Sequence, residues 1–498
     1  MSDSEARISS IPTGPDERED PESAPSLPAT TLAAQAIPRS EIESLREPRG
    51  AIGSSAGVAQ ILRLAWPIML AAGAVAVAGI VDRAMVGRLG DQSGGAAIPL
   101  AAVGIATQFF FLVQSSLFAV GLACVALMAR AIGAREPRRA QLAFGASLQV
   151  GVAISIGLSI PIALVAPWAF AFLGQEPAVT TAAIPYLNCV LASSVMMAAA
   201  LVIESALRAD KNVRTPMVVA VIVMASKLSL NWLLIFGNWG FPRLELFGAG
   251  VATLISQVLG LALLIASLRG RGTDSPLAVR MRDVFAANAR SREIMRIAIP
   301  GIAERLVMNT AMLSYIWVLG HYYGTLSVAA YTVGIPLLAF SWIPGQAYAQ
   351  ACATLIGQSL GAKEPDEAER IGWRAAALAI ATASVLGTVV AFWRFELAGL
   401  LTDDIAVITA LGPFMLALAM AQPLLQLQFT LGGAHRGAGD TTTPLIASCV
   451  GNWVFRVPLA FTFPIPLKTQ VPWTRYALNP HHLAPRPALP HPPPPPPL

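Results

Sequence analysis

The stretch Gly133-Ala134-Arg135-Glu136-Pro137 returns in the second half of the chain as Gly361-Ala362-Lys363-Glu364-Pro365. Two further matches keep the same offset: Ala101-Ala102 with Ala329-Ala330, and Arg208 followed by Thr215-Pro216 with Arg436 followed by Thr443-Pro444. Chance accounts for one such match but not for three at one spacing. We call this spacing of 228 residues the repeat offset. The chain is therefore a tandem duplication. Because each half is almost entirely apolar, the duplication predicts two related membrane bundles that face each other.

The composition places both halves in a membrane. Hydrophobic residues make up 55% of the 498 residues and charged residues 13%, against roughly 25% charged residues in a soluble domain. A spanning helix needs about 20 apolar residues, and we predict eleven spans: 64–86, 98–127, 140–165, 180–206, 215–237, 246–268, 296–319, 326–353, 373–393, 405–431 and 443–464. The expected fold is an all-α polytopic membrane protein of two homologous six-helix lobes related by internal duplication, with the twelfth helix missing or replaced.

The spans define five predicted regions. These are a disordered cytoplasmic tail at 1–56, a first six-helix lobe at 57–268, a cytoplasmic interlobe linker at 269–295, a second lobe of five helices at 296–464 and an aberrant proline-rich tail at 465–498. The first tail is polar, acidic and rich in proline, a composition that does not support a packed core. The linker is rich in arginine, which predicts an amphipathic segment at the cytoplasmic surface.

The second half is one helix short. By the repeat, the sixth span of the first half maps to about 475–495, where the sequence is interrupted by Pro480 and leads into a run of prolines. Such a segment does not form a helix. Two explanations stay open: a frameshift or mis-called 3′ end after Phe463, or a polyproline ligand for an SH3-like domain.

Basic residues gather on one side of the predicted spans. With the N-terminus inside, the even-numbered loops carry most of the arginine and lysine, including Arg135 and Lys363, and the opposite loops carry little beyond Arg88, Arg243 and Arg394. This bias predicts a cytoplasmic N-terminus. The net charge of +5 therefore reflects membrane orientation and does not indicate nucleic-acid binding.

A series of motifs resembles the multidrug and toxic compound extrusion (MATE) family of transporters. The motifs shared with the family are Leu64-Ala65-Trp66-Pro67, the stretch 81–90, the two Gly-Ala-x-Glu-Pro turns, Ala206-Leu207-Arg208 with Thr215-Pro216, and the stretch 233–237. Two more motifs are similar to the bacterial DinF-like branch of that family: Pro300 with Glu304-Arg305-Leu306, and the stretch 357–362. The resemblance covers about residues 61 to 463. It implies twelve helices in two lobes and cation-coupled export of amphipathic, often cationic compounds or metabolites.

From this resemblance we expect a monomer in the bacterial plasma membrane. Its expected partners are the lipid bilayer and a small organic cation or metabolite, with no nucleic acid. The missing twelfth helix is the main departure of this chain from the family pattern.

Asp82 is the first candidate for ion coupling. It follows an apolar run, 64–81, that contains no charge, and an ionisable residue inside a span is costly unless it is paired or hydrated. The resemblance implies that an aspartate at this place in the first helix binds the coupling proton or sodium ion. The alternative is an interfacial residue that helps to end the helix near Arg83 and Arg88.

The duplicate of Asp82 is not acidic. Pro67 corresponds to Pro300, and the same interval carries Asp82 to Tyr315. The cation site is therefore expected in the first lobe alone. This asymmetry favours a role in ion coupling over a role in the symmetry of the fold.

Lys227 and Asn231 lie one helical turn apart in the fifth span. Many members of the family that this chain resembles carry an asparagine and an aspartate at these places, near the first-helix aspartate. A lysine that faces Asp82 would pair with it and repel sodium, which favours proton coupling and leaves sodium as the alternative. The other interpretation of Lys227 is a side chain that extends to the membrane interface.

A second set of residues is expected to line a cavity. Glu304 either lines the second-lobe cavity near Asn309 or forms a structural salt bridge at the cytoplasmic mouth. The polar residues Gln108, Tyr186, Asn188, Gln346, Gln350 and Gln422 are expected along a central cleft. Taken one by one, each also fits a packing role or an interhelical hydrogen bond.

Three other functions stay open. A flippase for lipid-linked precursors would favour several cationic side chains in its cavity, and only Lys227 and Arg456 qualify. A membrane enzyme would need a clustered nucleophile, metal or cofactor site, and neither such a motif nor a phosphate-binding glycine loop occurs in the sequence. We therefore expect no enzyme activity, no metal and no cofactor. The third alternative is a non-functional, truncated transporter.

Overall fold

The computed structural model describes residues 55–458 apart from several short gaps. The gaps are 90–96, 173–175, 270–271, 273–274, 279–287, 319–320, 322–324 and 400–404. The predicted N-terminal tail, except its last two residues, and the predicted proline-rich tail lie outside the described residues. So does the stretch 475–495, to which the twelfth helix would map.

The described residues form helices joined by short turns. The long helices are α2 (Ser55–Gly87), α4 (Ala97–Gly133), α5 (Pro137–Phe172), α6 (Pro177–Ala209), α7 (Arg214–Phe236), α8 (Glu245–Leu268), α10 (Asn288–Val318), α11 (Thr325–Gly361), α12 (Pro365–Phe392) and α14 (Ile405–Gly437). The shorter elements are η1 (Asn238–Gly240), α13 (Arg394–Gly399), α15 (Thr442–Cys449) and the π-helix η3 (Val450–Arg456), which continues α15. Each of the first ten predicted spans, where it is described, lies within one long helix to within about a residue, and the described part of the eleventh, 443–464, covers α15 and η3.

Within the described part, seven helices are long and apolar enough to cross a membrane. They are α2, α4, α5, α6, α7, α8 and α12. Large apolar side chains point outward from these helices; on α5, Leu164 is 75% exposed and Trp168 is 68% exposed. Lipid tails solvate such a surface, which would be an aggregation site in water.

Both copies of the repeated stretch form the same turn. Arg135 and Lys363 adopt the left-handed backbone conformation, with φ of 58° and 65°. Pro137 and Pro365 then open α5 and α12, at a position where proline costs no helical hydrogen bond. α4 and α11 continue several residues past the predicted ends of their spans. An apolar run predicts only the part of a helix that lies in the membrane, and the helix can continue beyond it.

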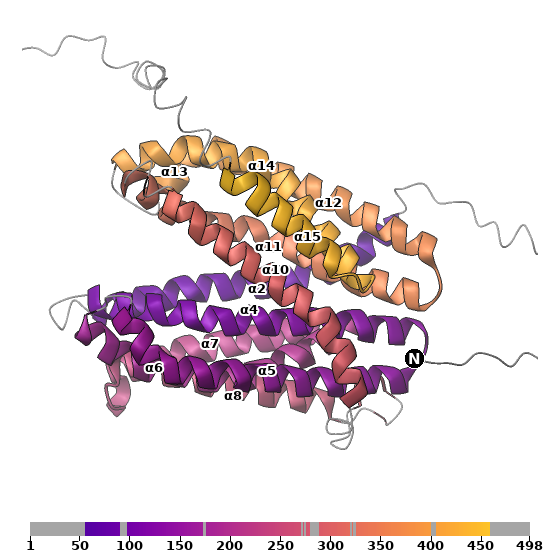
Figure 1. The fold of residues 1–498 in the computed structure, drawn as a ribbon, viewed down its shortest axis with the longest axis horizontal. Helices are drawn as coiled ribbons and strands as arrows, with labels where there is room; N and C mark the ends of the chain where they lie inside the picture. Colours follow the sequence, from indigo (N-terminus) through magenta and orange to yellow (C-terminus); the bar gives the residue numbers. More distant parts are fainter. Residues whose placement is uncertain are drawn as a thin grey trace, which may run out of the picture. The chain divides into compact units, whose positions relative to one another are not determined.

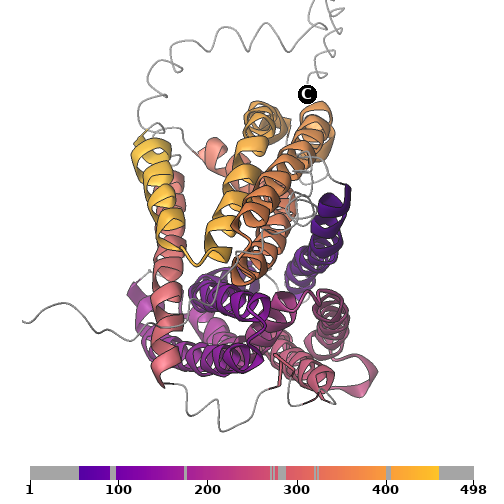
Figure 2. The same ribbon diagram turned by 90° about the vertical axis from the view of Figure 1, so that its right-hand side faces the viewer.

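The first helix of each half packs on both halves. The start of α2, at Ile61 and Leu64, packs against α11 and α12, whereas its later part packs on α7. The start of α10, at Ile294 and Ala298, packs against α4 and α5, whereas its later part packs on α15 and η3. Figures 1 and 2 show α10 running from the purple helices of the first half to the yellow helices of the second. The halves are therefore joined by an exchange of their first helices.

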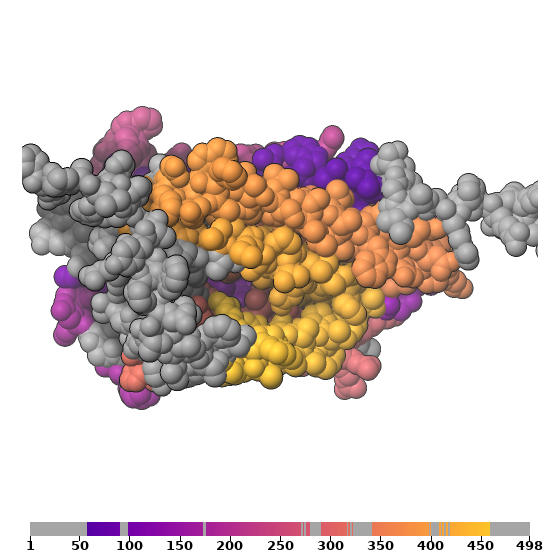
Figure 3. Space-filling model, turned by 90° about the horizontal axis from the view of Figure 1, so that it is seen from above, coloured from indigo at the N-terminus to yellow at the C-terminus, as the bar shows by residue number. Residues whose placement is uncertain are grey.

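α8 joins α6 to α7 in the first half. It packs along both, with Gly250 against Cys189 and Gly260 against Val223, whereas α6 and α7 make few contacts with each other. Their repeats, α14 and α15, also make few mutual contacts. Figure 3 shows a hollow between the orange helices and the yellow α15. The duplicate of α8 maps to residues outside the described part.

Candidate ion-coupling site

Three polar side chains meet between α2 and α7. Lys227 Nζ lies 3.0 Å from Asp82 Oδ2, and Asn231 Nδ2 donates a hydrogen bond to Asp82 Oδ1. Each carboxylate oxygen thus has its own donor. The side chains of Asp82 and Lys227 are 18% and 26% exposed, and Asn231 is fully buried. The ammonium group of Lys227 is directed to Asp82 and does not extend to the membrane interface.

Helix geometry brings this cluster together. Lys227 and Asn231 are four residues apart in α7 and therefore share one face. Asp82 lies near the end of α2, in the part of that helix that packs on α7. Asn231 Oδ1 is buried and has no hydrogen-bond partner among the described residues. A buried amide oxygen without a hydrogen-bond donor is unfavourable. Asn231 Oδ1 is therefore the atom of this cluster that would accept a hydrogen bond from one further donor.

Tyr186 of α6 is a predicted cleft residue that senses the charge of Asp82. It is buried, its hydroxyl is hydrogen-bonded to Thr107 of α4, and it lies within the electrostatic influence of Asp82. Gln108 follows Thr107 on α4 and is exposed, as is Asn188 on α6. Tyr186 is therefore a buried neighbour of the charge on Asp82, whereas Gln108 and Asn188 lie on exposed surface.

Glu304 of α10 forms a buried ion pair. Arg436 Nη2 of α14 lies 2.7 Å from Glu304 Oε1, and the side chains of Arg436 and Glu304 are 9% and 7% exposed. Ser448 of α15 donates to the same carboxylate oxygen at 3.3 Å. Of the two alternatives for Glu304, the geometry is that of the structural salt bridge. Asn309, farther along α10, is partly buried.

The remaining predicted cleft residues fall into two groups. Gln346 and Gln350 of α11 are partly buried. Gln422 of α14 is 2% exposed, and its amide donates to Ser341 Oγ at 2.8 Å. Its geometry is therefore that of an interhelical hydrogen bond inside the second lobe, not that of an open cleft wall.

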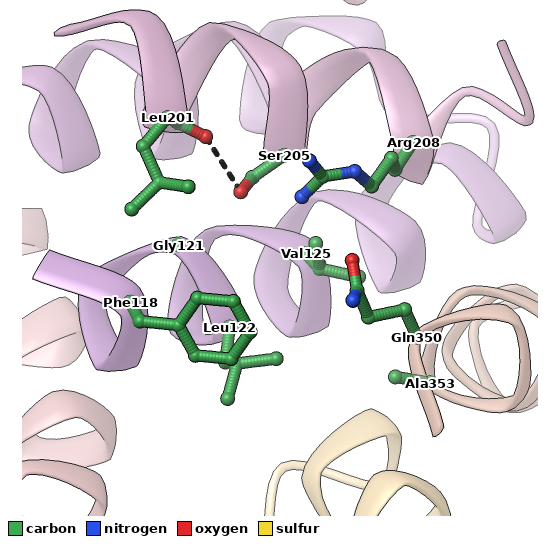
Figure 4. A pocket seen from close by; sticks show the side chains of 9 residues that line it. All are labelled: Phe118, Gly121, Leu122, Val125, Leu201, Ser205, Arg208, Gln350 and Ala353. Atoms are coloured by element: carbon green, nitrogen blue, oxygen red, sulfur yellow. Dashed lines mark hydrogen bonds between the residues drawn. The ribbon is translucent and has the colours of Figure 1, made fainter. Parts of the chain in front are cut away.

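A small pocket between the lobes contains Gln350. Its walls are Phe118, Gly121, Leu122 and Val125 of α4, Leu201, Ser205 and Arg208 of α6, and Gln350 and Ala353 of α11 (Figure 4). Arg208 is paired with Glu204 at 2.6 Å, the i,i+4 spacing that favours such pairs in helices. Arg305 of α10 stacks over the Phe118 ring at 5.0 Å. The pocket is thus apolar with a basic rim.

The lobes approach each other most closely where α4 and α11 run into the repeated turns, here called the turn end. Gln358 Nε2 donates to the last carbonyl of α6 at 2.6 Å, and Arg130 Nη2 donates to a carbonyl just past α14 at 2.6 Å. Arg130 and Gln358 are themselves related by the repeat offset. A Cβ on Gly133 would strike the Gln358 carbonyl, and a Cβ on Gly361 would strike the Arg130 carbonyl. The contact therefore follows the symmetry of the repeat.

The sequence did not predict the contact between the lobes at the turn end. It also did not predict a contact at the opposite end of the second lobe, where the Arg456 guanidinium stacks over the Tyr315 ring at 5.0 Å. The one available signal was that Arg130 and Gln358 occupy equivalent positions in the two halves. A repeat shows which residues correspond, but it does not show that they lie close together. Across the described part of the chain, no group of three or more His, Cys, Asp or Glu side chains is placed to hold a metal ion.

Comparisons with known proteins agree with this architecture. The profile of the MatE family matches residues 67–233 and 300–462, once in each half. "Probable multidrug resistance protein NorM" of Thermotoga maritima is 24% identical over 85% of this chain and 87% of its own length. The protein of the same name from Rhizobium meliloti is 28% identical over 78% and 82%.

A solved structure has the same fold. It is described as an outward-facing conformation of a multidrug resistance MATE family transporter of the MOP superfamily. It superimposes with a TM-score of 0.75 at 21% sequence identity and covers 82% of this chain and 88% of its own. With two matched copies that together span more than half of its residues, the chain belongs to the MatE family of multi-pass membrane transporters.

Proposed function

We propose that this transporter is an antiporter that exports amphipathic, cationic organic compounds in exchange for protons. It would work by alternating access in the plasma membrane of a bacterial cell, with its N-terminus in the cytoplasm. The observation that carries the proposal is the contact of Lys227 and Asn231 with the Asp82 carboxylate. The names of the two relatives, both multidrug resistance proteins, support the direction and the class of cargo.

The lysine favours protons over sodium as the coupling ion. Its ammonium lies 3.0 Å from the carboxylate, so a sodium ion at Asp82 would meet a positive charge in a partly dry site. A proton also adds a positive charge beside Lys227, but it binds covalently to one carboxylate oxygen, whereas a sodium ion needs several oxygen ligands at a carboxylate whose two oxygens already hold Lys227 and Asn231. The buried Oδ1 of Asn231, which has no partner in the described part of the chain, is suited to accept a hydrogen bond from the protonated carboxyl.

Protonation would change how α2 packs. A neutral Asp82 no longer attracts Lys227, whose charge is then less well compensated in its partly buried place. The two protonation states therefore favour different arrangements of α2 against α7. Because the start of α2 packs against α11 and α12, a shift of this helix also acts on the contact between the lobes. Proton and cargo would thus be linked by their preferences for different conformations.

The flippase alternative has weaker support. It calls for several cationic side chains that are free to hold a pyrophosphate. Lys227, Arg208 and Arg436 each lie within 3.0 Å of a carboxylate oxygen. Of the two cations that the sequence offers for this role, Lys227 and Arg456, only Arg456 then remains available, and a single cation is fewer than a pyrophosphate calls for.

The test is efflux of a fluorescent amphipathic cation from bacteria that lack their own pumps. Cells would express the full chain, its Asp82→Asn form or its Asp82→Glu form, with membrane content matched by immunoblot. We expect efflux from the wild type that collapses with the pH gradient and not with the sodium gradient, loss in Asp82→Asn and partial retention in Asp82→Glu. Glu293→Gln, which alters a carboxylate in a more exposed pair with Arg290, is the matched control and should retain efflux.

Two outcomes would overturn the proposal. Efflux driven by sodium alone contradicts the role of Lys227. Absence of efflux for every cationic dye, with the protein present in the membrane, contradicts the cargo class.

A further inference from the structure

Each lobe carries a cation on a helix that corresponds by the repeat. In the first lobe, Lys227 of α7 pairs with Asp82 of α2. In the second lobe, Arg456 at the end of η3 stacks over Tyr315 of α10 at 5.0 Å. α10 is the repeat of α2, and the interval from Pro67 to Pro300 carries Asp82 to Tyr315. The partner of the cation has thus changed from a carboxylate to an aromatic ring.

The π-helix explains the register of Arg456. Thr215-Pro216 and Thr443-Pro444 start α7 and α15 at the repeat offset, which would carry Lys227 to Phe455. The i→i+5 bonding of a π-helix takes up about one more residue in a turn than an α-helix does. Because η3 spans Val450–Arg456, it shifts the correspondence by one, and Arg456 takes the place of Lys227.

The charge of Arg456 is not neutralised by the ring. A guanidinium that stacks on an aromatic face keeps its N–H edge directed outward, where it fits carboxylate or phosphate oxygens. Lys227 and Arg436 each have a carboxylate in salt-bridge contact. For Arg456, an exposed residue, the described part of the chain contains no such carboxylate. A charge inside a membrane-spanning segment is costly unless it is paired, which favours an anion supplied by a ligand.

We propose that Arg456 and Tyr315 form an anion subsite for the cargo, with the ring of Tyr315 holding the guanidinium and its N–H edge binding a carboxylate. This inference rests on the proposed export function and narrows its substrate class. The preferred cargo is then zwitterionic: an amphipathic compound that carries, beside its cationic group, an anionic group for the second lobe.

The test compares a rhodamine methyl ester, which is a cation, with the corresponding free carboxylic acid, which is a zwitterion. Binding to the purified full chain in nanodiscs of zwitterionic lipid would be measured by fluorescence polarisation, and efflux of the same dyes would be measured in cells. We expect Arg456→Gln to weaken binding of the free acid by about tenfold or more, the size of a lost charge-assisted hydrogen bond, with little change for the ester. Tyr315→Phe should behave as the wild type, and Tyr315→Leu should lose part of the preference.

Controls separate this site from other basic residues. Arg394→Gln removes a similar stacked pair, with Phe395 at 4.7 Å, and should change neither dye. Arg305→Gln removes the stacking on Phe118. A free-acid preference that depends on Arg305 and not on Arg456 would overturn the proposal. So would an equal loss of both dyes in Arg456→Gln, or no loss of either.

The source of the anion is decided in the same assay. If anionic lipid added to the nanodiscs abolishes the difference between wild type and Arg456→Gln, the arginine binds a lipid phosphate and the assignment to cargo is wrong. Because binding is measured without transport, a wild type that binds the free acid through Arg456 but exports neither dye would contradict the export function alone. A wild type that exports the ester while Arg456→Gln changes nothing would contradict this subsite alone.

Discussion

At the scale of single residues, the same charges have different roles according to their partners. Asp82 is bound by an ammonium and an amide from one face of α7, and under the proposed function its contacts would change on proton uptake. Glu304 is bound by a guanidinium and a hydroxyl in a nearly closed place. The first pair is partly exposed and fits ion exchange, whereas the second is buried and fits structural stability.

Replacing Lys227 tests the first role. In Lys227→Met the carboxylate loses the charge that repels sodium and keeps the amide of Asn231. We expect efflux driven by the pH gradient to fall by about tenfold or more, the effect of about 1.4 kcal/mol, because the two protonation states of Asp82 then differ less in their contacts with α7, and a sodium gradient to become effective. Dye efflux under separate proton and sodium gradients measures this. Lys227→Arg keeps the charge and should stay driven by protons; a Lys227→Met protein with unchanged ion dependence would refute the role given to the lysine.

Glu304→Gln tests the second role. The change leaves the Arg436 guanidinium, only 9% exposed, without its counter-charge, and a buried charge that loses its partner costs about 3–5 kcal/mol. We expect a clear fall in the thermal unfolding temperature of the detergent-solubilised protein. Glu136→Gln is the control, because its pair with Arg139 is about half exposed and such surface pairs are worth about 1 kcal/mol or less. Similar shifts in the two variants would show that the buried pair has no special weight.

At the scale of elements, much of the fold could be predicted from the sequence. Apolar runs predicted each long helix but not the short α13 and η1, and the repeated Gly-Ala-basic-Glu-Pro stretch predicted a turn in each half. Contacts between helices were harder. Glu304 and Arg436 are far apart along the chain, and nothing in the local sequence relates them. The pairing of Lys227 with Asp82 was accessible because family resemblance placed both on neighbouring helices, whereas the stacking of Arg456 on Tyr315 depends on a π-helix that no sequence signal marked.

The turns before α7 and α15 provide a prediction about pH. Asp440 accepts hydrogen bonds from the backbone N–H groups of Thr442 and Thr443, and the side chain of Thr443 holds the pKa of this carboxyl below its ordinary value of 3.8. The folded pKa is therefore depressed. The stabilising effect is present above about pH 4 and is lost as the pH falls through the folded value.

A substitution at Asp440 isolates this effect. We expect Asp440→Asn to show a smaller loss of thermal stability between about pH 5 and about pH 3 than the wild type, because an amide accepts the same bonds at any pH in this range. The repeat supplies the reverse experiment. Asn212, the counterpart of Asp440 in the first half, accepts the backbone N–H of Thr215, and Asn212→Asp should add pH dependence. Identical pH profiles for wild type and Asp440→Asn would contradict this account.

At the scale of the whole molecule, the two lobes are in close contact at the turn end. The contact is made by backbone: glycines at 133 and 361 let α4 and α11 approach, and Arg130 and Gln358 each donate to a carbonyl of the other lobe. Backbone contact of this kind is sensitive to a single methyl group. If the transporter works by alternating access as proposed, this end must open, and we expect the stability of the contact to set the balance between conformations.

Gly133→Ala should shift that balance, because the added Cβ meets the carbonyl of Gln358, which belongs to a helix backbone and yields less easily than a side chain. The readout is the distance distribution between spin labels at positions 135 and 363, on the two exposed turns, in a cysteine-free background that is first shown to be folded. We expect the short-distance population to fall and a longer one to appear. Gly104→Ala is the matched control, because it makes the same change in the same helix and its Cβ would meet nothing within 4 Å. If Gly133→Ala and Gly104→Ala give the same distribution, steric contact at the turn end does not govern the conformational balance, and the lobes are held together by the hydrogen bonds of Arg130 and Gln358 instead.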